Sequence, residues 1–479
     1  MVDAVLPETH ERRDSSRPGL ILGVLSLSGG AYAMLQSLVV PALPVLQHDL
    51  HTSTAGVAWV FTSYLLAASV VTPIAGRLGD MFGKKRVLVV ALWGLAAGSL
   101  LAAVVHSLPL MIVARTIQGL GGAIFPLAFG IIRDEFPRER VASAIALMSG
   151  ILGIGGGLGI VLAGPILQNL SYHWLFWIPL VVTGGSAIAA MMLVPESTLR
   201  APGDVHWLGA ALLSGWLVAL LLAVSEASTW GWGSAKTIGL IVLAAVIAAV
   251  WVRAEARARH PLVDMTMMRL KGVWTTNAAA LLLGFGMYSA FILIPQFVQT
   301  PKSTGYGFGA SVTQSGLFLV PTTIALLITS PLGGRLSNAV GSKVPLVLGS
   351  AITTLAFVVL ALAGARWEIY IASALVGIGV GFAFASMANL IVEAVPPGQT
   401  GVATGMNTIV RTIGGAIGAE VAASILAANL LGSGLPAKHG YTITFSICAA
   451  VVAAGILASL AVPGRRRQDA HVLTVADPV

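Results

Sequence analysis

The feature that most constrains this chain is a series of long apolar stretches that contain no Asp, Glu, Lys or Arg. A helix needs about 20 predominantly apolar residues to cross a bilayer. The longest stretch, residues 141–195, is long enough for two helices and is divided by a polar segment at 168–173. The pattern predicts fourteen membrane-spanning helices, at residues 19–46, 56–78, 87–105, 109–132, 141–167, 174–194, 206–225, 236–253, 273–298, 311–334, 344–363, 368–393, 401–429 and 441–462.

Composition supports the same conclusion. Hydrophobic residues make up 56% of the chain and charged residues 10%, whereas soluble domains carry about a quarter charged residues. We therefore predict an all-α, polytopic membrane protein. Soluble enzymes, disordered proteins and disulfide-stabilised secreted domains are excluded, the last because Cys448 is the only cysteine.

Lysine and arginine predict the orientation, because they concentrate in cytoplasmic loops. Of the 27 such residues, 21 lie in the tails or in loops that follow an even-numbered helix, and four lie in the other loops. The remaining two, Arg115 and Arg411, lie well inside spans, away from their ends. We expect a multi-pass protein of the cell inner (plasma) membrane with both termini in the cytoplasm.

The chain also repeats itself at an offset of 258 residues: residues 76–88 align with residues 334–346, including Gly-Arg-Leu at the start of both. Two halves of matching orientation are typical of transporters built from parallel repeats. We predict two pseudo-symmetric six-helix bundles, 19–200 and 272–463. Between them lies a segment of two inserted helices and a cytoplasmic linker, 201–271, and the tails are 1–18 and 464–479.

Three segments resemble a known family. Residues 76–88 resemble the loop between helices two and three of the major facilitator superfamily, and residues 114–123 resemble its fourth-helix motif. Fourteen predicted spans and Arg411-Thr412-Ile413-Gly414-Gly415 are similar to the drug:proton antiporter branch of multidrug efflux type. Two positions depart from that branch: Leu35 stands where an Asp is frequent, and Ile160 stands where a proline is usual.

The resemblance implies a conformational latch in the 76–88 loop. Its acid, Asp80, is expected to meet the amino end of the helix that starts near Gly401, where the helix dipole favours an anion. A tight turn with ordinary cytoplasmic charges is the alternative. The predicted latch residues are Gly76, Arg77, Asp80, Gly83, Lys84 and Arg86.

Three charged residues, Arg115, Arg411 and Glu420, lie well inside predicted spans, away from their ends. A charge in the hydrocarbon region is costly and is expected to face the bundle interior with a partner. Arg115 could hold a carboxylate or an anionic substrate group, or it could simply satisfy neighbouring carbonyls. Glu420 is a candidate proton carrier, because burial raises the pKa of a carboxyl, unless it reaches water. Arg411, nine residues earlier on the same helix, faces the opposite side from Glu420 and cannot pair with it.

Uncharged polar residues in the spans are expected to line an amphipathic central cavity. They are Gln36, Tyr64, Gln118, Asn277, Tyr288, Gln296, Gln314, Asn389 and Asn407. Each could instead make an interhelical contact. Gly155, Gly159 and Gly164 are interpreted as a hinge in the fifth helix, with close helix packing as the alternative.

No catalytic set, zinc-type histidine spacing or Walker loop occurs in the sequence. We predict a secondary active transporter, not an enzyme, that exports amphipathic or lipophilic small molecules such as drugs and antibiotics by alternating access and proton antiport. Expected partners are the substrate, protons and membrane lipid; we expect a monomer that binds no nucleic acid, metal or cofactor. An exporter of lipid or of an endogenous natural product with altered or absent proton coupling is the alternative, favoured by Leu35. A non-transporting membrane ligand sensor is the alternative of another class.

Overall fold

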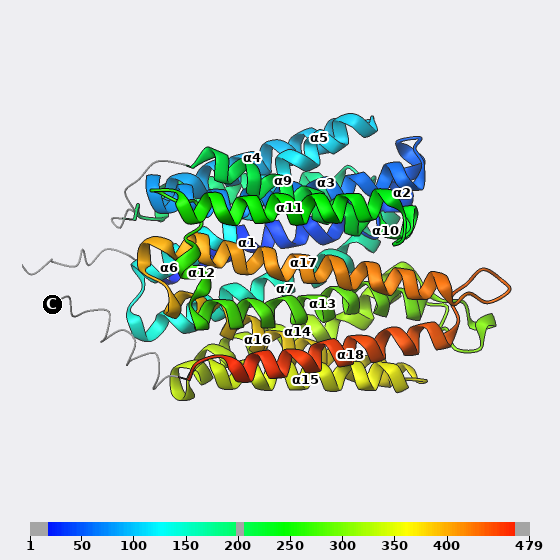
Figure 1. Cartoon of the computed structure of the whole chain (residues 1–479). Helices are drawn as coiled ribbons and strands as arrows, with labels where there is room; N and C mark the ends of the chain where they lie inside the picture. The colour runs from blue at the N-terminus through cyan, green and yellow to red at the C-terminus, as the bar shows by residue number, and fades with distance from the viewer. Residues whose placement is uncertain (1–17, 198–205, 465–479) are drawn as a thin grey trace, which may run out of the picture.

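A computed structural model of the chain describes residues 18–197 and 206–464. Within them, fourteen helices are long and apolar enough to cross a membrane, and they run side by side in one bundle (Figure 1). The prediction of an all-α polytopic membrane protein with fourteen spans is confirmed. The predicted tails, except Pro18 and Gly464, and the charges at Arg200 and 465–467 lie outside the described residues.

The spanning helices follow the predicted ranges closely. They are α1 (Pro18–Leu38), α3 (Thr54–Phe82), α4 (Lys84–Val104), α5 (Leu108–Gln118) continued by α6 (Ile124–Glu135), α7 (Arg138–Asn169), α8 (Trp174–Leu193), α9 (Trp207–Ser225), α11 (Ala235–Arg257), α13 (Lys271–Gln299), α14 (Val312–Val340), α15 (Lys343–Leu362), α16 (Arg366–Ala394), α17 (Thr400–Ala428) and α18 (Lys438–Ala461). Short helices in the connections are α2 (Leu43–Asp49), α10 (Ala227–Trp230) and α12 (Met265–Arg269).

The first predicted helix, 19–46, was too long. In the structure α1 ends at Leu38 and a separate short helix, α2, begins at Leu43. Pro41 lies between them, and a proline has no N–H to donate to the preceding turn of a helix. Because residues 38–46 are all apolar, a hydropathy pattern does not show this break.

The fourth predicted helix, 109–132, is not one regular α-helix. A 3₁₀ segment, η1 (Gly119–Ala123), joins α5 to α6. Its glycines lie directly against α3: a Cβ on Gly119 would lie 2.4 Å from the Cβ of Ala67, and one on Gly122 would lie 2.7 Å from the carbonyl oxygen of Ala68. This part of the fourth span is therefore shaped by close packing on α3.

Helices α1 and α3–α8 share one apolar core, and α13–α18 share another. Contacts between these two groups run mainly along α7 with α14 and along α3 with α17. The inserted helices α9 and α11 pack on each other, and α9 also contacts α3 and α17. Figure 1 shows α17 running the length of the bundle near its middle.

The glycines of α7 allow close approach to two helices at once. A Cβ on Gly155 or Gly159 would lie 2.8 Å or 2.6 Å from a carbonyl oxygen of α1, whereas one on Gly164 would lie 2.5 Å from Thr313 of α14. The helix itself runs unbroken from Arg138 to Asn169. These glycines therefore pack closely on α1 and α14, and the hinge stays a prediction.

Candidate functional site

A cavity of about 390 Å³ lies between the two groups of helices. Its walls come from α1, α3, α7, α9, α13 and α17, and most of its lining side chains are aliphatic or aromatic. The polar lining residues are Gln36, Ser37, Thr62, Ser225, Tyr288, Thr412 and Glu420. A largely apolar cavity with a few polar groups is the usual form of a small-molecule site.

Two of the nine predicted cavity residues, Gln36 and Tyr288, line this cavity. A third, Asn407, lines a separate small chamber and donates a hydrogen bond from Nδ2 to Oδ1 of Asn277 at 2.9 Å. Asn277 is itself buried by this contact. These two polar residues on adjacent helices thus form a hydrogen bond with each other and do not line the large cavity.

The other predicted cavity residues lie elsewhere, and the expectation for them is corrected. Asn389 donates to the carbonyl of Ala142 at 3.3 Å, Gln314 forms the capping box that starts α14, and Gln296 is exposed. Tyr64 and Gln118 surround Arg115. A polar residue in a span must find a hydrogen-bond partner, but the sequence does not say which partner.

Arg115 is completely buried within the amino-terminal group of helices. Its Nε donates to the carbonyl of Val60 at 2.9 Å, its Nη1 donates to Oε1 of Gln118 at 2.7 Å, and its guanidinium lies 4.3 Å from the centre of the Tyr64 ring. Within the described residues it forms no ion pair. The contacts match the structural alternative, a cation that satisfies neighbouring carbonyls.

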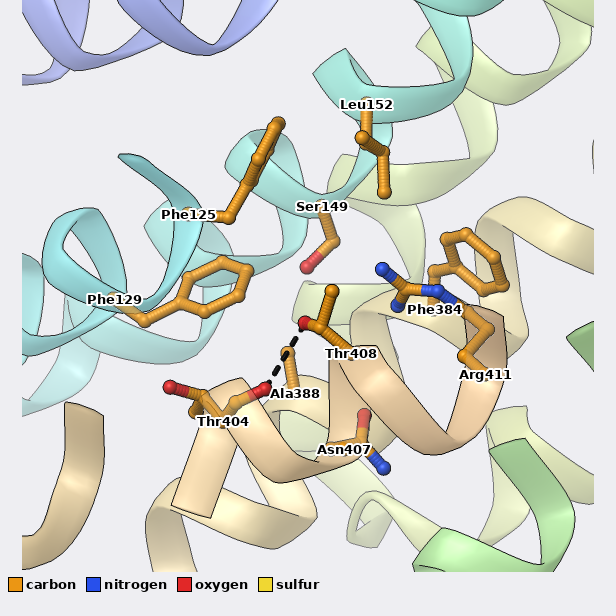
Figure 2. A pocket seen from close by; sticks show the side chains of 10 residues that line it. All are labelled: Phe125, Phe129, Ser149, Leu152, Phe384, Ala388, Thr404, Asn407, Thr408 and Arg411. Carbon is orange, nitrogen blue, oxygen red and sulfur yellow. Dashed lines mark hydrogen bonds between the residues drawn. The ribbon is translucent and has the colours of Figure 1, made fainter. Parts of the chain in front are cut away.

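Arg411 and Glu420 lie on α17 and face different hollows. Glu420 is 8% exposed and lines the large cavity. Arg411 is also 8% exposed, but it lines a small chamber with Ser149, Asn407 and Thr408. Figure 2 shows its guanidinium pointing into that chamber beside Phe384, whose ring centre is 4.4 Å away.

The inserted helix α9 supplies two lining residues that the sequence analysis did not propose, Leu221 and Ser225. Leu221 is 6% exposed. A Leu in an apolar span carries no signal that separates a cavity wall from a lipid-facing position. Only the packing of α9 between α3 and α17 reveals that this helix closes one side of the cavity.

The predicted latch residues lie where α3 meets the start of α17. Asp80 faces the backbone N–H of Val402 in the first turn of α17, and it is 1% exposed. Lys84 Nζ lies 3.7 Å from Oδ1 of Asp80 and 2.6 Å from Oδ2 of Asp134. Asp134 was not among the predicted residues, because a partner 50 residues away in the chain is brought to Lys84 only by folding.

The remaining latch residues surround this buried cluster. Arg77 is partly buried one turn before Asp80. Gly83 has a φ of +112°, which requires glycine, and it lets the carboxylate of Glu196 approach the start of α4. Glu196 accepts from the backbone N–H of Lys85 at 3.2 Å and lies 3.6 Å from Nε of Arg86, which is largely exposed.

Several hydrogen bonds join the two groups of helices at this end of the bundle. Nη2 of Arg133 donates to the carbonyl of Val395 at 2.9 Å, and its Nη1 donates to Oγ1 of Thr400 at 2.6 Å. Nδ2 of Asn338 donates to the carbonyl of Glu139 at 3.1 Å. The end of the bundle that carries these basic loops, hereafter the basic end, is therefore closed, and the large cavity lies toward the other end, near Val40, Leu43 and Ser225.

Comparison with protein families gives one match across most of the chain. The model described as Major Facilitator Superfamily matches residues 25–419. The solved structure of the human organic anion transporter MFSD10 superposes with a TM-score of 0.66 at 15% identity, covering 92% of this chain and 99% of that one. The two proteins therefore share a fold.

Curated relatives are bacterial proteins named for transport or for drug resistance. The tetracenomycin C resistance and export protein of Streptomyces glaucescens is 29% identical over 392 residues, which cover 81% of this chain and 72% of that protein. Multidrug resistance protein 3 of Bacillus subtilis is 31% identical over 318 residues, covering 66% of this chain and 60% of that protein. An uncharacterised MFS-type transporter of Mycobacterium tuberculosis is 31% identical over 352 residues, covering 73% of this chain and 50% of that protein.

Proposed function

The chain belongs to the major facilitator superfamily, and we propose that it is a secondary active transporter that exports amphipathic or lipophilic small molecules. The observation that carries this proposal is the cavity of about 390 Å³ between the two groups of helices, with an apolar wall and a few polar groups. A sugar or a phosphate would find few hydrogen-bond partners there. The names of the relatives, one of which exports the antibiotic tetracenomycin C, favour the same class of substrate.

Transport would proceed by alternating access. The basic end of the bundle is closed by Arg133 and by the contact of Asp80 with α17, while the cavity lies toward the other end. With the basic loops in the cytoplasm, this arrangement is an outward-facing state. Opening toward the cytoplasm would require the contacts at the basic end to break and new contacts to form on the opposite side of the cavity. A two-state equilibrium of this kind exposes one binding site to each side of the membrane in turn.

The proton gradient across the membrane would drive export of the substrate, through antiport of protons. Glu420 is a carboxyl in the cavity wall of a membrane-spanning helix, and intramembrane carboxyls commonly carry protons in transporters. The protein would lie in the cell inner (plasma) membrane as a monomer, with both termini in the cytoplasm.

A second candidate is an exporter of lipid or of an endogenous natural product without the usual proton coupling. It is favoured by Leu35, which is fully buried in the apolar core of the first group of helices at the position where related antiporters often carry an acid. The two candidates differ in whether protons move with the substrate.

Substrate-triggered proton movement in proteoliposomes tests the proposal. The purified full chain is reconstituted with a pH-sensitive dye inside, and a panel of lipophilic cations, anions and neutral amphiphiles is added. Proton movement that requires a ligand would support antiport. Ligand flux without proton flux would favour the second candidate, and ligand binding without any flux would indicate a sensor and overturn both.

A further inference from the structure

The large cavity continues inward as a narrow polar passage. This passage, hereafter the throat, has a volume of about 30 Å³ and shares Gln36, Leu65, Leu152, Tyr288 and Thr412 with the cavity. The throat in turn shares Phe125, Leu152, Thr408 and Arg411 with the chamber of about 10 Å³ drawn in Figure 2. The three hollows therefore form one series along the centre of the protein.

Polar groups become denser along this series. The cavity wall is mainly apolar, whereas the throat is lined by two tyrosines, one glutamine, four hydroxyl side chains and Arg411. No Asp or Glu lines the throat or the chamber within the described residues. The inner end of the series therefore carries positive charge and hydrogen-bond donors without a compensating acid.

Arg411 is the cation at the junction of throat and chamber. It is 8% exposed, its guanidinium lies over the ring of Phe384, and its Nε has no hydrogen-bond partner. It forms no ion pair in the part of the chain that the structure describes. Arg115 differs in its surroundings: it donates hydrogen bonds to Val60 and Gln118, only its Nη2 is without a partner, and it lines none of these hollows. A buried guanidinium with no anionic partner is unfavourable, and planar anions such as carboxylates satisfy it well.

We infer that Arg411 is the binding site for the acidic end of the substrate, and that the substrate class is amphipathic organic anions. This inference rests on the proposed function and adds a chemical class and an orientation to it. At about 30 Å³ the throat has room for about two water-sized groups. The two oxygens of a carboxylate therefore fit there while the apolar body of the molecule remains in the cavity. Glu420 lies nine residues further along α17, about 14 Å at 1.5 Å per residue. An acidic group is therefore favoured near Arg411 and disfavoured near Glu420, so the acidic end of the substrate points inward.

Three probes with one body and different heads test this inference: 1-pyrenebutyrate, 1-pyrenebutanol and the matching pyrenebutyl-trimethylammonium. Binding to the purified full chain is followed by pyrene fluorescence. The wild-type protein is expected to bind the acid at least about tenfold more tightly than the alcohol, and the ammonium most weakly. Equal affinities for acid and alcohol, or a preference for the ammonium, would overturn the inference without any variant being needed.

Two variants test whether the preference for the acid depends on Arg411. Arg411→Gln should remove the preference for the acid while it changes alcohol binding by less than about threefold. Thr408→Asp places a carboxylate beside Arg411 in the throat and should remove the same preference while it leaves the guanidinium paired. Retained alcohol binding shows that each variant is folded. An unchanged preference for the acid in Thr408→Asp would overturn the inference even if Arg411→Gln fails to fold.

Efflux of the same probes from proteoliposomes separates this inference from the proposed function. If all three probes are transported at similar rates whatever their head group, the transporter proposal is supported and the proposed role of Arg411 is contradicted. If the acid binds through Arg411 but none of the probes moves, the site stands and the transporter proposal falls.

Discussion

Gly76 of α3 and Gly401 of α17 meet backbone to backbone. A Cβ added to Gly76 would lie 2.5 Å from the carbonyl oxygen of Gly401, and one added to Gly401 would lie 2.7 Å from the carbonyl oxygen of Gly76. These two helices belong to opposite halves of the molecule, and Asp80 lies one turn beyond Gly76 against the same end of α17. The closed basic end therefore depends on two positions without side chains.

We expect Gly401→Ala to open the basic end. An added methyl group in a tightly packed contact costs roughly 1–3 kcal/mol, which corresponds to a shift of about fivefold to more than a hundredfold in a two-state equilibrium. Cysteine accessibility at the basic end, measured in a Cys448→Ser background, reports the shift. Gly184→Ala is the matched control, because no atom lies within 4 Å of a Cβ at that position. Equal accessibility in the two variants would contradict the prediction.

Asp80→Asn should slow turnover roughly tenfold while it changes ligand affinity by less than about threefold. The substitution removes the anion that faces the amino end of α17 and the charge 3.7 Å from Lys84, but it leaves the cavity intact. Initial rates and equilibrium binding of the same substrate give the two numbers. Glu196→Gln serves as the control, since its pair with the largely exposed Arg86 is expected to contribute little. A normal rate in Asp80→Asn would remove the latch.

Glu420→Gln should abolish substrate-linked proton movement and leave ligand binding measurable. The amide keeps the size of the side chain in the cavity wall but cannot load a proton. Proteoliposomes with an internal pH dye measure the effect. Glu226→Gln, at the end of α9, is the matched control. Undiminished proton flux in Glu420→Gln would contradict the role of this residue as proton carrier.

Leu221→Trp should weaken substrate binding at least about fivefold, because the larger side chain fills part of the cavity wall contributed by α9. Val218→Trp, three residues earlier on the same helix and 36% exposed, should have little effect. Equilibrium binding of one substrate to both variants provides the test. If both bind like the wild-type protein, α9 does not form a functional wall.

Thermal stability should fall as the pH drops from about 7.5 to about 5.5. Burial lowers the pKa of His173, and His106, whose ring centre lies 5.0 Å away, lowers it further, although Asp49 opposes the shift. A histidine with a lowered pKa in the folded state contributes stability above its unfolded pKa of about 6.5 and loses it as the pH falls. Melting temperatures of His173→Asn should depend less on pH, while the exposed control His439→Asn should match the wild type. The same dependence in all three proteins would contradict this origin.

The number of spans, the internal repeat and the residues that mark the family can all be read from the amino-acid sequence. These features depend on one property of each segment, because every span must be apolar along its length whatever it packs against. Breaks within a span are harder to predict from hydropathy. Helix α1 ends near Pro41, eight residues before the predicted boundary, in a segment that is apolar on both sides of the break.

Which polar residues line the same hollow depends on how the helices pack in three dimensions. The rotation of each helix about its own axis is set by packing against segments far away in the chain, so the same kind of residue can have different surroundings. Arg115 is satisfied by the carbonyl of Val60, whereas Arg411 faces the throat below a cavity that α9 helps to enclose. The sequence shows both arginines as charges inside spans, and only the packing of the helices places Arg115 among carbonyl and amide groups and Arg411 beside the throat.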